Sequence, residues 1–254
     1  MNGLFRGLVI LAGLLAVWQA VVILSGVPTF ILPPPASVFR SMVGNAGLLA
    51  GHAGITLAEI LAGLVLGTGL GCASALLMSR LRPARRWLLP VLVASQAVPV
   101  FALAPILVLW LGYGMASKVA MATLIIYFPV TATFYDGLRR TEPGWLDMAA
   151  TMNASPWATL RHIQIPAALP AFASGLKVSA AVAPIGAVVG EWVGSSAGLG
   201  YLMLHANAQL KTDLMFAGLV VLAAIGLTLY FTIDALSRRL LPWQSDDLST
   251  NGEP

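Results

Sequence analysis

The sequence predicts an all-α integral membrane protein with six transmembrane helices. Three observations support this fold class: 58% of the 254 residues are hydrophobic, only 9% are charged, and the apolar residues form long continuous runs. A soluble domain has about 25% charged residues. A mean hydropathy of +0.86 leaves too little polar surface to cover a globule in water. The composition therefore excludes a water-soluble globular enzyme, and it excludes intrinsic disorder, which requires low hydrophobicity.

Six apolar stretches are long enough to cross a bilayer. A hydrocarbon core of about 30 Å needs roughly 20 helical residues, and these stretches lack the two-residue alternation of a barrel strand. We expect one membrane domain over residues 1–245, followed by a polar tail over 246–254. The predicted spans are 7–25, 54–78, 87–111, 116–135, 173–193 and 214–236.

The basic residues predict the orientation of these spans. If the N-terminus is cytoplasmic, every Lys and Arg except Arg40, Lys118 and Lys211 falls on the inner side. The positive-inside rule therefore predicts that both termini are cytoplasmic. We expect the first span to be retained, because its apolar run is long and residues 27–30 offer no small-residue cleavage site.

The second span carries two local patterns. Gly63, Gly67 and Gly71 recur every four residues, which places them on one helix face where another helix can approach closely. Thr56 and Glu59 have the spacing of a capping box. We therefore expect Glu59 to cap the start of this helix rather than to form a site.

The longest inner connection, residues 136–172, carries the most informative motif. Small residues dominate 149–155, which on a short helix leaves a slim surface for another protein to grip. Pro156 is tolerated in the first turn of a new helix, so a helix, a break and a second helix are predicted. Composition alone is equally compatible with an amphipathic surface helix that has no partner.

This connection resembles the cytoplasmic EAA motif of ABC-type importer permeases, and its spacing fits throughout. Asp147 stands at the acidic position, Asn153 at the glycine and Ile163 at the isoleucine. After glycine, asparagine best tolerates a left-handed backbone, so the turn can be kept. The resemblance implies that the residues coupling the chain to an ATPase are Asp147, Met148, Ala149, Ala150, Asn153, Ala154, Ser155, Ile163 and Pro166.

Three other segments extend the resemblance to the nitrate, sulfonate and taurine group of these permeases. They are residues 95–114, 136–139 and 190–194. Within that group, the Gln-x-x-Pro-Val pattern from Gln96 and the Gly-Glu-Trp sequence at 190–192 are most similar to permeases assigned to thiamine-precursor pyrimidines such as hydroxymethylpyrimidine. The resemblance implies import of a small organic solute by alternating access, with sulfonate, taurine or nitrate as the next substrates.

The family resemblance also implies the partners. A type I ABC importer permease forms a homodimer in the bacterial inner membrane, surrounded by lipid. It carries a cytoplasmic coupling helix and binds a cytoplasmic ABC ATPase dimer and a periplasmic or lipid-anchored substrate-binding protein. This chain has no Gly-Lys dipeptide and hence no P-loop. We therefore expect no cofactor in it, with ATP and Mg bound by the ATPase, and no nucleic-acid partner, because its cations are not clustered on a polar face.

Three residues are candidates for the translocation pathway, each with a structural alternative. Glu191 is an ionisable group near a span, which often indicates function, but it can also be solvated at the helix end. Trp192 can stack on a flat substrate or lie at the membrane interface. Gln96 can line the pathway or bond to a neighbouring helix. No metal site is expected, because His52 and His162 fall in separate loops and Cys72 is the single cysteine.

The main alternative function is an ion-coupled secondary transporter. Such proteins often have paired broken helices and carboxylates at the midplane, and neither is clear in this sequence. An intramembrane hydrolase is a more distant alternative, based on the G-x-S-x-G spacing at 194–198. That segment falls at the outer end of a membrane helix instead of a strand-to-helix turn.

Overall fold

The computed structural model describes residues 3–243, with side chains from Phe5 onward, and all regular elements in that range are helical. The tail predicted over 246–254 lies outside the described residues. The elements are α1 (Gly3–Ser25), α2 (Pro35–Gly44), α3 (Ala46–Arg80), α4 (Arg82–Ser95), α5 (Val100–Leu111), α6 (Met115–Arg139), α7 (Pro143–Thr151), α8 (Pro156–Thr159), the π-helix η1 (Leu160–Gln164), α9 (Ile165–Gly194), α10 (Leu199–Ala208) and α11 (Thr212–Leu240).

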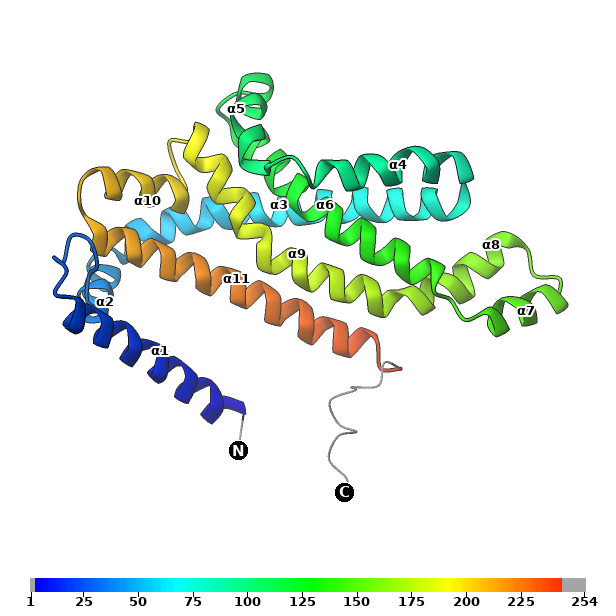
Figure 1. Ribbon diagram of the computed structural model, residues 1–254, viewed down its shortest axis with the longest axis horizontal. Helices are drawn as coiled ribbons and strands as arrows, with labels where there is room; N and C mark the ends of the chain where they lie inside the picture. Colours follow the sequence, from blue (N-terminus) through cyan, green and yellow to red (C-terminus); the bar gives the residue numbers. More distant parts are fainter. Residues whose placement is uncertain (1–2, 244–254) are drawn as a thin grey trace.

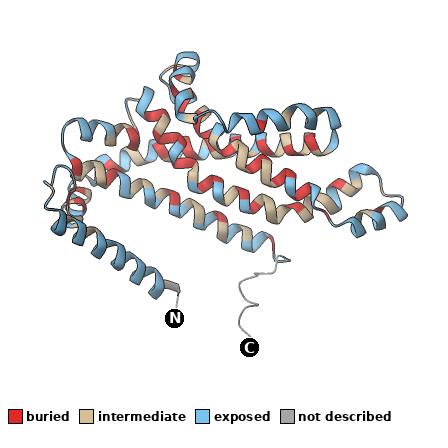
Figure 2. Cartoon of the chain, viewed as in Figure 1, coloured by how far each residue is buried: buried red, intermediate tan, exposed pale blue. Residues whose placement is uncertain are grey.

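Helices α3, α6 and α9 form the core of the molecule. A Cβ atom added at Gly63, Gly67 or Gly71 of α3 would lie 2.5–2.9 Å from side chains of α6. The close approach predicted for this glycine face is therefore confirmed. Figure 2 shows buried positions concentrated on these helices, and Ala122 and Ile126 of α6 are fully buried.

The molecule is elongated, with different small helices at its two ends. Figure 1 shows α7 and α8 at one end and α2 and α10 at the other. Helix α1 lies largely apart from the bundle, and no residue in its apolar span is buried. Near its C-terminal end, Trp18 lies against Phe216 of α11, with a ring-centroid distance of 5.7 Å.

The structure differs from the single span expected over residues 87–111. Within residues 3–243, five helical segments are long and apolar enough to cross a membrane, and α4 with α5 forms a sixth candidate that is bent by 105°. The break lies at residues 96–99. Pro99 has no backbone N–H and disfavours a helical conformation in the preceding residue, which explains why the helix stops there.

Helix α3 also begins earlier than expected, at Ala46. Thr56 and Glu59 therefore lie in the interior of this helix, and the capping-box interpretation is wrong. His52, expected in a loop, is also helical. Thr56 and Glu59 are both buried, so the longer helix carries polar side chains into the protein interior.

Candidate functional site

The predicted helix, break and helix around residues 147–156 is confirmed. Helix α7 ends in a Schellman turn, in which the Ala154 N–H donates to the Ala149 carbonyl at 2.9 Å and the Asn153 N–H donates to the Ala150 carbonyl at 3.0 Å. Asn153 has the left-handed conformation that this turn requires, with φ of +54°. Ser155 then caps α8 by accepting a hydrogen bond from the Ala158 N–H at 3.2 Å.

The nine expected coupling residues differ in their solvent exposure. Asp147, Met148, Ala150, Asn153 and Ser155 are exposed. Ala149 is buried, and Ala154, Ile163 and Pro166 are partly buried. The exposed side chains are mostly small or flexible, which leaves room for another protein to approach the backbone of α7.

Helices α8, η1 and α9 form one unbroken helical segment of 39 residues, from Pro156 to Gly194. At about 1.5 Å per residue this segment is roughly 60 Å long. Leu160 anchors its start in a core cluster that includes Met78 and Phe134. The Arg80 guanidinium also lies 5.1 Å from the ring centroid of Trp157. The α7–α8 turn is therefore connected to α9 by continuous helix.

The far end of this segment carries a buried carboxylate, Glu191, whose exposure is 1%. Its Oε1 accepts a hydrogen bond from Thr56 Oγ1 at 2.6 Å. Its Oε2 accepts hydrogen bonds from the backbone N–H of Gly200 and, at 3.3 Å, from that of Tyr201. Glu191 therefore joins α9 to both α3 and α10.

Two further bonds complete the junction at the start of α10. The Gly198 N–H donates to His52 Nδ1 at 3.0 Å, and the Leu199 N–H donates to Thr56 Oγ1 at 2.8 Å. The first N–H groups of a helix lack intrahelical partners and carry partial positive charge. Side chains of α3 and α9 thus satisfy four successive donors, and the Glu191 carboxylate complements the helix dipole.

Two glycines make space for this carboxylate. Gly198 has φ of +105°, and a Cβ there would overlap the Glu191 carboxyl group. A Cβ at Gly200 would lie 2.8 Å from Glu191 Oε2. The G-x-S-x-G spacing at 194–198 therefore ends in a glycine needed for helix capping, and the hydrolase interpretation has no structural support.

A second buried acid and a buried cation lie beside the junction. Glu59, at 1% exposure, lies one turn along α3 from Thr56. Its Oε2 has no hydrogen-bond partner in the described part of the chain. Lys118 is 4% exposed and donates to the carbonyls of Tyr113 at 2.9 Å and Gly114 at 3.1 Å. The sequence interpretation missed this group, although ionisable residues in apolar helices are a recognised signal.

The three expected pathway residues do not come together within one chain. Glu191 is buried at the junction, whereas Trp192 is 50% exposed on another face of α9. Gln96 is exposed in the break between α4 and α5, where its Nε2 donates to Ser95 Oγ at 3.3 Å. The geometry thus assigns Glu191 to helix anchoring and leaves Trp192 and Gln96 on open surfaces.

Comparison with protein families gives the chain its class. The binding-protein-dependent transport system inner membrane component family matches residues 63–244. The chain belongs to this family. It is a multi-pass membrane protein and a permease subunit of an ABC importer, and members of the family are transport subunits rather than enzymes.

Named relatives of this permease cover nearly its whole length. A probable ABC transporter permease protein of Haemophilus influenzae is 57% identical, over 94% of this chain and 97% of the relative. The riboflavin transport system permease protein of Chloroflexus aurantiacus is 39% identical, over 91% and 87%. The formylaminopyrimidine transport permease protein of Halalkalibacterium halodurans is 38% identical, over 91% and 92%. The taurine transport system permease protein of Escherichia coli is 30% identical, over 93% and 88%.

Solved structures confirm the fold of this permease. A chain of the inward-facing MetNI methionine ABC transporter superposes with a TM-score of 0.67 and covers 77% of this permease and 97% of itself. The sequence identity is 19%, so the likeness establishes the type I importer fold alone.

Proposed function

We propose that this permease imports a small flat heterocycle by alternating access, with a pyrimidine precursor of thiamine as the favoured substrate. The relatives named for formylaminopyrimidine and riboflavin are 38–39% identical to the chain, whereas the relative named for taurine is 30% identical. This difference supports a heterocycle over a sulfonate. Riboflavin is the second candidate, because the relative named for riboflavin is as similar to this chain as the relative named for formylaminopyrimidine.

The observation that carries the coupling proposal is the exposed α7 surface, which lies next to a segment that runs as continuous helix into α9. The surface residues Ala150 and Asn153 would bind a cytoplasmic ABC ATPase dimer, which binds the ATP and Mg. Nucleotide-driven closure would then move the helical segment Pro156–Gly194 as one lever. The excess of basic residues on this side supports a cytoplasmic location for α7 and for both termini.

Apolar and aromatic surfaces support a homodimer. Helix α1 packs little against its own bundle. Trp110 and Tyr113 are 75% and 76% exposed, and Trp192 is 50% exposed. A second copy would cover part of these surfaces, and Gln96 and Trp192 would line a pathway between the two copies. Aromatic rings stack favourably on flat heterocycles, which fits the proposed substrate class. A substrate-binding protein would deliver the solute at the α2 and α10 end.

Uptake measurements test this function. Cells that lack the permease gene, with and without the restored gene, are supplied with radiolabelled hydroxymethylpyrimidine. We expect uptake only with the gene, competition by formylaminopyrimidine and loss of uptake when the partner ATPase is inactivated. Competition by riboflavin would favour the second candidate, and competition by taurine alone would contradict a heterocyclic substrate. Uptake that needs no ATPase but stops with a protonophore would contradict the ABC mechanism and support an ion-coupled carrier.

A further inference from the structure

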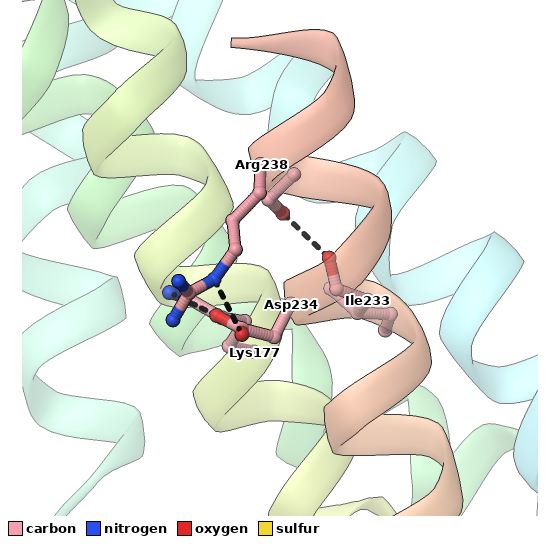
Figure 3. A network of polar contacts seen from close by, with 5 residues as sticks. Lys177, Ile233, Asp234 and Arg238 are labelled. Carbon is pink, nitrogen blue, oxygen red and sulfur yellow. Dashed lines mark hydrogen bonds and ion pairs between the residues drawn. The ribbon is translucent and has the colours of Figure 1, made fainter. Parts of the chain in front are cut away.

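A polar cluster lies between α9 and α11, away from the α7 surface and the α10 junction. Figure 3 shows Lys177 and Arg238 converging on Asp234. Lys177 Nζ lies 3.0 Å from Asp234 Oδ1, and Arg238 Nε lies 3.0 Å from Asp234 Oδ2. The Lys177 and Asp234 side chains are only 26% and 19% exposed. Two cations thus share one carboxylate, with Lys177 and Asp234 partly buried and the Arg238 side chain 63% exposed.

This cluster lines a polar cavity. The cavity has a volume of about 270 Å³, and its lining includes Ser174, Lys177, Asp234, Ser237 and Arg238. Among the described lining residues, Lys177 and Arg238 are basic and Asp234 is acidic. An ammonium group carries three N–H donors, of which Lys177 uses one on Asp234. The cavity can therefore accept a small anionic group.

An apolar cavity adjoins the polar one. It has a volume of about 340 Å³, and its lining includes Leu169, Phe172, Leu176, Ile233 and Leu240. Both cavities are lined by Ala173, Ser237 and Leu241. A charged compartment and an apolar compartment therefore lie side by side, an arrangement that fits an amphiphile.

The position along the helices matches the edge of a bilayer. A hydrocarbon core takes about 20 helical residues, which from Gly194 back along α9 reaches about residue 175. The same count from Thr212 along α11 reaches about residue 231. Lys177 and Asp234 therefore lie close to the ends of these two 20-residue stretches, which agrees with a place near the inner edge of the hydrocarbon core. Basic pockets between membrane helices at this depth bind lipid head groups.

We propose that this double cavity is a binding site for an anionic phospholipid. The phosphate lies against Lys177 and Arg238, and an acyl chain lies along Leu169, Phe172 and Leu176. The lipid bridges α9 and α11. Because α9 is the helix connected to α7, the bound lipid would stiffen it at the membrane surface. This proposal does not depend on the identity of the transported solute.

Native mass spectrometry of the full-length permease in detergent tests the site. Dioleoyl-phosphatidylglycerol is titrated against dioleoyl-phosphatidylcholine, which has the same chains but no net charge. We expect preferential binding of phosphatidylglycerol and about fivefold weaker binding for Lys177→Gln, since one basic residue near the head group contributes roughly this factor. Lys177→Arg should retain the affinity. Arg86→Gln, an exposed cation of α4 that lines neither cavity, should leave it unchanged.

A second variant is expected to bind the lipid more tightly, which a misfolded protein would not do. Asp234→Asn removes the acidic lining residue among the described residues, so we expect it to bind phosphatidylglycerol more tightly by about the same factor. Equal affinity for the two lipids, or unchanged binding in both Lys177→Gln and Asp234→Asn, would overturn the proposal. Thermal stabilisation by inorganic phosphate as large as that by phosphatidylglycerol would also overturn it, because it would indicate a site for a free anion.

Discussion

Thr56 Oγ1 lies 2.6 Å from Glu191 Oε1, although 135 residues separate them in the chain. This bond fixes the far end of α9 to the N-terminal third of α3, and the other carboxylate oxygen caps α10. Because α9 continues through η1 and α8 to the exposed turn after α7, one continuous helical segment joins this turn to the Glu191 junction. We therefore expect changes at Glu191 to alter coupling as well as local stability.

Replacing Glu191 with Ala should destabilise the permease by about 2–4 kcal/mol. The substitution leaves the buried N–H of Gly200 and the part-buried N–H of Tyr201 without their acceptor. An unsatisfied buried group costs roughly 1–3 kcal/mol, and a part-buried group costs less. Thermal unfolding in detergent measures the loss, and hydrogen exchange locates it. The amides of residues 198–201 should exchange much faster. Trp192→Phe, at the neighbouring exposed position, should change stability by no more than about 0.5 kcal/mol; an equal effect would contradict the capping role.

The periodic features of the chain could be predicted from the sequence, and the polar junction could not. Apolar runs of about 20 residues reflect the bilayer thickness directly, and glycines at 63, 67 and 71 reflect a local helix contact. The partners of Glu191 come from residues 52–56 and 198–201. No local pattern relates these segments, because only the packing of α3 against α9 and α10 brings them together.

The dependence on tertiary packing also explains two other differences between the predicted and the observed structure, at the start of α3 and between α4 and α5. Thr56 and Glu59 have the spacing of a helix start, but α3 already begins at Ala46 and continues through Gly47, Gly51 and Gly54, since no proline stands in this stretch. The proline at position 99 was visible in the sequence, whereas the 105° angle between α4 and α5 depends on how α5 packs against α6 and α9. The spacing of residues in the sequence thus predicts where helices form better than it predicts how they pack or which contacts their side chains make.

The glycine face of α3 gives a second prediction. A methyl group at Gly67 would lie 2.7 Å from Ile126 Cγ2 and 3.1 Å from the Thr123 carbonyl oxygen, so the two helices must separate. We expect Gly67→Ala to lower stability by about 1–3 kcal/mol, as overpacking of a core does. Gly69→Ala is the matched control, because no atom lies within 4 Å of its added Cβ. It should be neutral or stabilising by up to about 1 kcal/mol; equal loss in both variants would contradict close packing at Gly67.

A third prediction concerns the α7 surface. Ala150 is exposed, so Ala150→Arg should fold normally but obstruct the approach of the ATPase. We expect about a tenfold or greater loss of co-purified ATPase, which corresponds to roughly 1.4 kcal/mol, and a parallel loss of uptake. Ala154→Arg should have the same effect on transport, with some loss of stability because Ala154 is partly buried. Ala50→Arg adds the same charge at an exposed position near the start of α3, far along the chain from α7, and should leave ATPase binding intact.

Variants at Asn153, in the left-handed turn after α7, distinguish the effect of the backbone turn from that of the asparagine side chain. Asn153 has φ of +54° and an exposed side chain. A β-branched residue in this conformation is disfavoured by about 1–2 kcal/mol, whereas glycine adopts it without strain. Asn153→Val should therefore open the turn and weaken ATPase co-purification by roughly fivefold or more, while Asn153→Gly retains it. Pull-down of the ATPase with each variant at equal membrane expression measures the difference. If Asn153→Gly lost binding as fully as Asn153→Val, the asparagine side chain itself, rather than the backbone turn, would be what the partner recognises.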